Sequence, residues 1–191
     1  MSELKLFMVI IGCTPKGRFT EQHDVFFGIA NSLRELVPQM IAFWKEADGH
    51  IHIDAWRQIS VVDDFAVTII ENENADKTSD KKLFFINLGG YKENEFEEYH
   101  YKIVTAASDK GEAVRKSKQT AFYKHCGFKG AESHIDDKYG IDVDDLYEIE
   151  DILPDKIKNK FRVILSPKND AAQDELHIGY LKIDKLLKSD L

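Results

Sequence analysis

Acidic and histidine side chains alternate at two separate places in the first half of the chain. Glu21 is followed two residues later by His23, and His52 is followed two residues later by Asp54. On a β-strand, alternate residues share a face and lie roughly 6.5–7 Å apart, so the members of each pair would project together. If the two strands are neighbours, two imidazoles and two carboxylates would meet, a donor set suited to zinc, manganese or iron.

The same motifs recur in the second half of the chain, where Glu98 and His100 repeat the first pair. The sequence therefore predicts two divalent-metal sites. Their expected ligands are Glu21, His23, His52 and Asp54 in the first, and Glu98, His100, His134 and Asp136 in the second. The alternative is that these groups only hydrogen-bond the nearby backbone and fix the local geometry.

The two histidines that follow glutamate also suggest acid–base chemistry. His23 and His100 are the candidate catalytic residues of a hydrolase that acts on a small phosphoester, because a carboxylate beside an imidazole tunes it as a general acid or base. Arg18 is the candidate anion-binding residue, and its position in the second copy is taken by Glu95. A third hypothesis is a non-catalytic protein-interaction scaffold, in which these side chains only stabilise the fold.

An internal repeat indicates which elements carry these residues. Lys5-Leu-Phe recurs as Lys82-Leu-Phe, which is a shift of 82 − 5 = 77 residues. The same shift places Gly12 on Gly89 and His23 on His100, and the shift later grows through small insertions. The chain is therefore predicted to hold two tandem copies of one unit.

Each copy is predicted to be an α+β unit of order ββαββ, an antiparallel sheet with one helix packed on one face. We expect repeat unit 1 at residues 1–72, a linker at 73–81, and repeat unit 2 with a C-terminal extension strand at 82–191, arranged about a pseudo-twofold axis. Expected strands cover 4–11, 21–30, 51–62 and 65–71, and then 83–88, 98–107, 145–149, 161–166 and 177–183. Helices are expected from Leu33 to Trp44, with a kink or restart at Pro38, and from Lys110 to His125.

The Glu-x-His and His-Ile-Asp motifs, with the opening Lys-Leu-Phe strand and its glycine turn, resemble the bacterial family known as domain of unknown function 1543. The resemblance covers nearly the whole chain and implies a tandem two-copy member. It brings no activity, cofactor or partner.

Charge and cysteine usage narrow the expected partners. Thirty-four acidic against twenty-six basic side chains give a net charge of -8, which disfavours nucleic acid and anionic membranes as partners. The two cysteines, Cys13 and Cys126, stand at non-equivalent positions of the repeat, which is typical of a reducing cytoplasm. We therefore expect a cytoplasmic protein, a monomeric pseudo-dimer or a homodimer, with a small molecule or a protein as partner.

Overall fold

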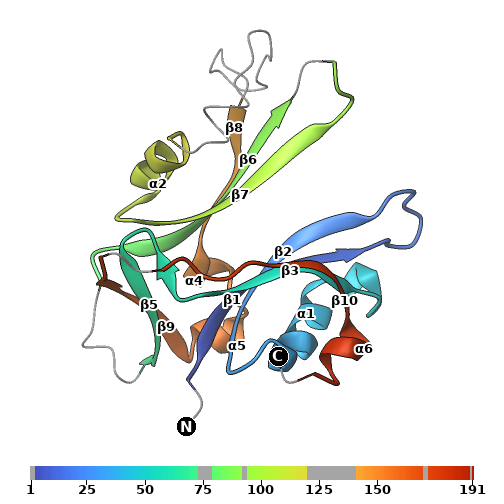
Figure 1. Cartoon of the computed structure of the whole chain (residues 1–191), viewed down its shortest axis with the longest axis horizontal. Helices are drawn as coiled ribbons and strands as arrows, with labels where there is room; N and C mark the ends of the chain where they lie inside the picture. The colour runs from blue at the N-terminus through green and yellow to red at the C-terminus, as the bar shows by residue number, and fades with distance from the viewer. Residues whose placement is uncertain (1–2, 73–78, 92–93, 120–140, 170–171, 190) are drawn as a thin grey trace. The chain divides into compact units, whose positions relative to one another are not determined.

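The computed structural model describes residues 3–72, 79–91, 94–119, 141–169, 172–189 and 191 (Figure 1). Its contacts divide the chain into two compact units. The first unit combines Met1–Asp76 with Leu153–Leu191, and the second is Lys77–Ile152. No helix in the described part of the chain is long and apolar enough to cross a membrane.

The first unit is built on a four-stranded antiparallel sheet with the order β10-β3-β1-β2. Its strands are β1 (Lys5–Cys13), β2 (Gln22–Ala30), β3 (His52–Ile59) and β10 (His177–Lys182). A second sheet of the same unit has the order β4-β5-β9 and consists of β4 (Val61–Val62), β5 (Phe65–Glu71) and β9 (Phe161–Pro167). The predicted α+β class with antiparallel strands is confirmed.

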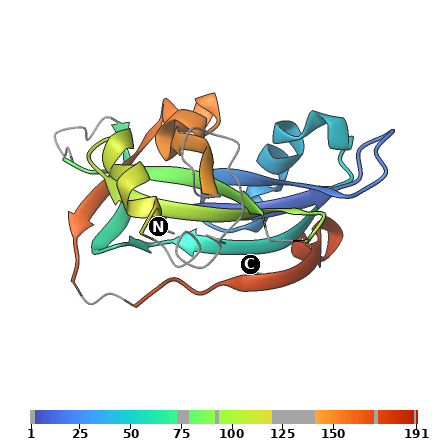
Figure 2. The same cartoon turned by 90° about the horizontal axis from the view of Figure 1, so that it is seen from above.

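Helical segments between β2 and β3 cover one face of the larger sheet (Figure 2). They are a 3-10 turn at Arg34–Leu36, helix α1 at Val37–Phe43 and a second 3-10 turn at Lys45–Ala47. Pro38 lies in the first turn of α1, where its missing N–H has no intrahelical partner to lose. The helix therefore restarts at the proline, as the sequence predicts.

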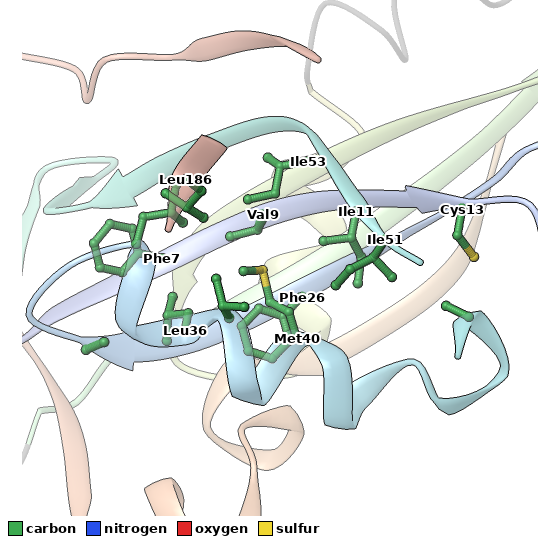
Figure 3. Close-up of a cluster of buried hydrophobic side chains, with 14 residues drawn as sticks. Phe7, Val9, Ile11, Cys13, Phe26, Leu36, Met40, Ile51, Ile53 and Leu186 are labelled. Atoms are coloured by element: carbon green, nitrogen blue, oxygen red, sulfur yellow. The ribbon is translucent and has the colours of Figure 1, made fainter. Parts of the chain in front are cut away.

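The hydrophobic core of the first unit lies between this sheet face and the helices (Figure 3). Alternate residues of β1, from Phe7 through Val9 and Ile11 to Cys13, point into it. Met40 of α1 packs against them, and Leu186 of α6 (Ile183–Leu186) belongs to the same cluster. Because β1 gives every second side chain to this core, its other residues, Gly12 among them, face the opposite side of the sheet.

The second unit contains a three-stranded antiparallel sheet with the order β7-β6-β8. Its elements are β6 (Lys82–Tyr91), β7 (Glu98–Ala107), α2 (Lys110–Ser117), β8 (Ile141–Glu148) and α4 (Ile149–Ile152). Asp109 caps α2 by accepting a hydrogen bond from the Glu112 amide at 2.8 Å. Asp109 is therefore the N-cap residue that starts this helix.

The predicted domain boundaries need a correction at the C-terminus. The sequence placed all of 82–191 in the second unit, but Leu153–Leu191 belongs to the first. After α5 (Asp155–Lys158), strand β9 pairs antiparallel with β5 from Phe161↔Glu71 onward, and β10 pairs with β3. The described second unit is therefore ββαβ followed by a short helix, because its expected fourth strand completes a sheet of the first unit.

Candidate metal centre

The ends of three neighbouring strands of the first unit bring the predicted ligands together. In the register of the sheet, Gly12 of β1 stands opposite His23 of β2 on one side and His52 of β3 on the other. Residues directly opposite one another on antiparallel strands project from the same face. The two histidines therefore flank the glycine on the face that the core does not use, and Glu21 immediately precedes β2, two residues before His23.

A β-bulge in β3 adds the fourth residue. Ile10 pairs with Ala55 and Ile11 pairs with Ile53, so Asp54 is the extra residue between them. Bulges re-aim side chains and occur often beside functional sites. Here the bulge brings the Asp54 carboxylate within reach of both imidazoles.

The four side chains alternate, imidazole beside carboxylate, around one small space. Nε2 of His23 lies 3.6 Å from Glu21 Oε2 and 3.3 Å from Asp54 Oδ2. Nε2 of His52 lies 3.1 Å from Glu21 Oε1 and 3.3 Å from Asp54 Oδ1. Glu21, His23 and His52 each offer a donor atom within 4.8 Å of the others, and Asp54 contacts both rings.

These separations fit the coordination shell of a divalent cation. The edge of a tetrahedron is about 1.6 times the distance from its centre to a corner, so zinc bonds of about 2.0–2.2 Å place ligand atoms about 3.3–3.6 Å apart. The observed contacts between imidazole nitrogen and carboxylate oxygen run from 3.1 to 3.6 Å. Each carboxylate turns one oxygen toward each ring, so the match holds for the individual pairs of donors, and Glu21, His23 and His52 are the three that offer single donor atoms close to one another.

Two buried atoms of the cluster make no hydrogen bond. They are Nε2 of His52 and Oδ2 of Asp54. A buried polar atom left without a hydrogen bond costs about 1–3 kcal/mol, so such atoms call for an explanation. Coordination of a cation would satisfy both at once.

The β1 residue between the two histidines is Gly12, and a glycine is needed there for a steric reason. A Cβ atom at Gly12 would stand 2.6 Å from His52 Nε2 and 2.7 Å from Asp54 Oδ2. Any side chain there would push the two donors away, so glycine is the residue that leaves room for them.

The cluster combines one enclosed side with one open side. The His52 side chain is 9% exposed, whereas His23 and Glu21 are 45% and 46% exposed. A cation held here would have protein on one side and solvent on the other, which is the arrangement that leaves a coordination position for water or a ligand.

The sequence did not point to Tyr180, which borders the site. Its ring lies 4.4 Å from the His52 ring, centroid to centroid, and comes from β10, the strand beside β3. Tyr180, His50 and Lys182 line a cavity of about 490 Å³ that also reaches His52. No repeat or motif signals Tyr180, because it enters the site only through the pairing of β10 with β3.

The second unit reproduces part of this arrangement. Gly89 of β6 stands opposite His100 of β7 and Asp142 of β8, and a bulge leaves Asp144 as the extra residue. Nδ1 of His100 lies 3.1 Å from Asp144 Oδ2, and Nε2 lies 3.8 Å from Glu98 Oε2. These three residues form the second described group of donors.

The expected second-unit ligands His134 and Asp136 lie outside the described residues. The sheet register gives the positions of His52 and Asp54 to Asp142 and Asp144 instead, a shift of 144 − 54 = 90 residues. The signal that could have found them is the pattern Asp142-Val-Asp144 beside His52-Ile-Asp54.

Arg18 and Cys13 lie near the loop that joins β1 to β2, Arg18 within it and Cys13 at the end of β1. Arg18 is exposed, and its backbone amide donates to the Pro15 carbonyl at 3.1 Å in the turn before Glu21. Cys13 is buried, and burial together with the negative charge of Glu21 raises the pKa of its thiol. A raised pKa disfavours the thiolate, so Cys13 lacks the electropositive setting of a nucleophile.

The fold and the site together define an α+β protein whose antiparallel sheet carries a histidine–carboxylate cluster on one face. Residues 18–69 match the family described as Domain of Unknown Function (DUF1543). The matched segment contains Glu21, His23, His52 and Asp54.

The whole chain is also similar to a solved structure, the crystal structure of a protein Il1583 from Idiomarina loihiensis. The TM-score is 0.61 at 19% identity, and the match covers 94% of this chain and 97% of that chain. The similarity therefore concerns the fold. No curated protein matches the chain.

Proposed function

We propose that the first unit binds a divalent transition-metal ion, zinc in the first place, through Glu21, His23, His52 and Asp54. Imidazole nitrogen and carboxylate oxygen are the donors that Zn²⁺, Mn²⁺ and Fe²⁺ accept, and two of each converge here. The observation that carries the proposal is His52 Nε2, which is buried, makes no hydrogen bond and faces the other donors.

The competing explanation is a purely structural polar cluster. If both imidazoles are protonated, each would make ion pairs with the two carboxylates, and the ring of alternating charges would need no ion. In that case the protein is an interaction scaffold. Alanine at His23 or His52 would then lower stability without removing any ligand.

Metal content of untagged protein, purified without chelator and measured by elemental analysis, separates these explanations. We expect zinc, manganese or iron in the unaltered protein and its loss from the first site in a His23→Ala/His52→Ala variant. His50→Ala is the matched control, because His50 is exposed and is not one of the donors in the described clusters. Protein that stays metal-free after supplementation with Zn²⁺, Mn²⁺ and Fe²⁺ would leave only the scaffold.

A metal-dependent hydrolase is the second candidate function, and the half-exposed side of the cluster favours it. In this candidate only Glu21, His52 and Asp54 hold the ion. His23, whose ring is 45% exposed and lies 3.3 Å from Asp54, is then the general base and not a fourth ligand. A metal ion bound beside it would lower the pKa of a coordinated water and supply the nucleophile. Arg18, in the loop before Glu21, is placed to meet an anionic substrate.

Phosphoester hydrolysis by the metal-loaded protein tests this second candidate. We expect turnover of a small phosphomonoester or phosphodiester that falls at least 100-fold in His23→Gln, while Arg18→Ala raises KM more than it lowers kcat. Full activity in His23→Gln at normal metal content would refute the assigned base. A metal-loaded protein without hydrolytic activity would leave metal binding as the function.

The likeness between the two units supports a tandem duplication in the history of this chain. β2-β1-β3 and β7-β6-β8 have the same order, and their bulges begin after Ile10 and Asn87, which are 87 − 10 = 77 residues apart. We propose that each unit descends from one ββαβ ancestor that carried the glutamate–histidine pair, in a cytoplasmic protein.

A further inference from the structure

We propose that the second unit holds a separate, oxygen-rich cation site, formed by Glu98, His100 and Asp144, that discriminates between Zn²⁺ and Mn²⁺ far less than the first unit does. The existence of this site is independent of the first cluster, because every donor in it comes from the second unit, whereas the comparison between the two sites rests on the proposed function. Its consequence is a chain with two unlike cation sites where the repeat predicts two equal ones.

The scaffold of the site is the one that positions the donors in the first unit. Gly89 stands opposite His100, as Gly12 stands opposite His23. A Cβ atom at Gly89 would collide with the carboxylate of Asp144, just as one at Gly12 would collide with Asp54. The space above the glycine is thus kept open in both units, and a carboxylate from a bulge fills the same place.

The first difference lies opposite Gly89 on β8. Asp142 holds the register position that His52 holds opposite Gly12. Among the described donors, the second group contains one imidazole, His100, and two carboxylates, whereas the first contains two imidazoles. Fewer nitrogen donors lower the preference for zinc, since carboxylate and carbonyl oxygens suit Mg²⁺, Ca²⁺ and Mn²⁺.

The second difference is a polar residue beside the histidine. Asn87 occupies the register position of Ile10, and its Nδ2 lies 3.2 Å from His100 Nδ1 and 3.3 Å from Asp145 Oδ2. The other amide atom, Oδ1, is buried and makes no hydrogen bond. Asn87 therefore competes for one imidazole nitrogen and adds an amide oxygen to the neighbourhood, and amide oxygens are ligands of hard cations.

Both differences act in the same direction. Nearly every site of nitrogen and oxygen donors binds Zn²⁺ more tightly than Mn²⁺, and the margin comes largely from imidazole and thiolate ligands. Among the described donors the second site has one imidazole, which is already hydrogen-bonded, so its preference for Zn²⁺ over Mn²⁺ should be much smaller. The ratio of the two dissociation constants, Mn²⁺ over Zn²⁺, should thus be at least about 10-fold smaller in the second unit.

Two variants isolate the sites for titration with the metal ions alone. His23→Ala/His52→Ala leaves the second site, and Glu98→Ala/His100→Ala leaves the first. Zn²⁺ is titrated by calorimetry and Mn²⁺ by the paramagnetic resonance signal of the free ion. We expect the first variant to bind one Mn²⁺ per chain and to lose at least 10-fold in affinity when Asp144→Asn is added.

The control is Glu97→Gln in the same background, because Glu97 neighbours Glu98 in sequence, precedes β7 and is not one of the donors in the described clusters. It should leave the Mn²⁺ affinity unchanged, and circular dichroism confirms that each variant is folded. If Asp144→Asn does not fold, Glu98→Gln provides the same test.

Three results would overturn the proposal. The first is that the His23→Ala/His52→Ala variant binds no Mn²⁺ at millimolar concentration. The second is that its Mn²⁺ binding does not change when the Asp144 or Glu98 carboxylate is removed. The third is a ratio of Mn²⁺ to Zn²⁺ dissociation constants equal to that of the first site. If the Glu98→Ala/His100→Ala variant binds no metal while the His23→Ala/His52→Ala variant binds Mn²⁺, the proposed function is refuted and the cation site of the second unit remains.

Discussion

Replacing Gly12 with alanine should abolish metal binding in the first unit without removing a single ligand. The backbone at Gly12 is not in the left-handed region, so alanine fits it without strain. The new Cβ would stand 2.6 Å from His52 Nε2, 2.7 Å from Asp54 Oδ2 and 3.0 Å from His52 Cε1. The effect of the substitution is therefore steric and directed at the two most enclosed donors.

The magnitude follows from these distances. Ordinary contact begins near 3.4 Å, so the His52 nitrogen must retreat by 3.4 − 2.6 = 0.8 Å. Metal–ligand bonds tolerate displacements of only about 0.2 Å. His52 is buried and stacks on Tyr180, so its ring has little room to restore the bond elsewhere. We expect zinc affinity to fall at least 100-fold, which corresponds to about 2.7 kcal/mol.

The assay is competition for Zn²⁺ against a chromophoric chelator, with thermal unfolding of the metal-free protein measured in parallel. Gly28→Ala is the matched control, because its Cβ would stand 2.7 Å from Leu36 Cδ2, an apolar neighbour away from the cluster. Gly28→Ala should lower stability by about 1–3 kcal/mol through overpacking and leave the zinc affinity unchanged. Wild-type zinc affinity in Gly12→Ala would refute the geometry on which the site rests.

Three further outcomes test the fold around the sites. Hydrogen bonds from Lys81 and the Ser108 amide lower the Glu112 pKa to about 2, so this carboxylate stabilises the fold above its unfolded pKa near 4.5 and stops doing so as the pH falls toward 2. The urea midpoints of Glu112→Gln and of the unaltered protein should therefore differ at pH 7 and converge near pH 2. A difference that stays constant with pH would contradict the assignment. Cys13 is buried and its thiol pKa is raised, so it should react slowly with a thiol reagent. In a Cys126→Ser variant we expect the reaction to be at least 100-fold slower in folded than in urea-unfolded protein. Equal rates would show that the thiol is accessible. Asp174→Ala removes the acceptor of three hydrogen bonds and should lower the free energy of unfolding by about 1–3 kcal/mol in urea titration; no change would mean that these bonds add nothing net.

Local sequence patterns predicted the elements that carry the first site. The continuous apolar run of β1 marks a buried strand, and Pro38 marks the start of a helix. Period-two spacing also placed Glu21 with His23 on one face, because this spacing depends only on the geometry of an extended backbone. The sequence expected the strands that carry the two pairs to be neighbours, but β1 lies between β2 and β3, and the two histidines stand on either side of Gly12, which has no side chain to separate them.

Where insertions separate the copies, the sheet register adds two positions that matching letters did not indicate. His134-Ile-Asp136 repeats the letters of His52-Ile-Asp54, yet the register opposite Gly89 belongs to Asp142 and the bulged position to Asp144. A bulge is a property of two paired strands. Its position therefore cannot be read from either strand alone.

The sequence by itself determined the α+β class, the strand–strand–helix–strand order of each unit and the donor types at the first site, because these depend on residues close together along the chain. Only the tertiary structure decided where the C-terminal strands go. β10 pairs with β3, more than a hundred residues earlier, and brings Tyr180 against His52. Hydrogen bonds between strand edges are the same for every sequence, so the partner of a strand is chosen by the packing of the whole sheet and not by the strand's own residues.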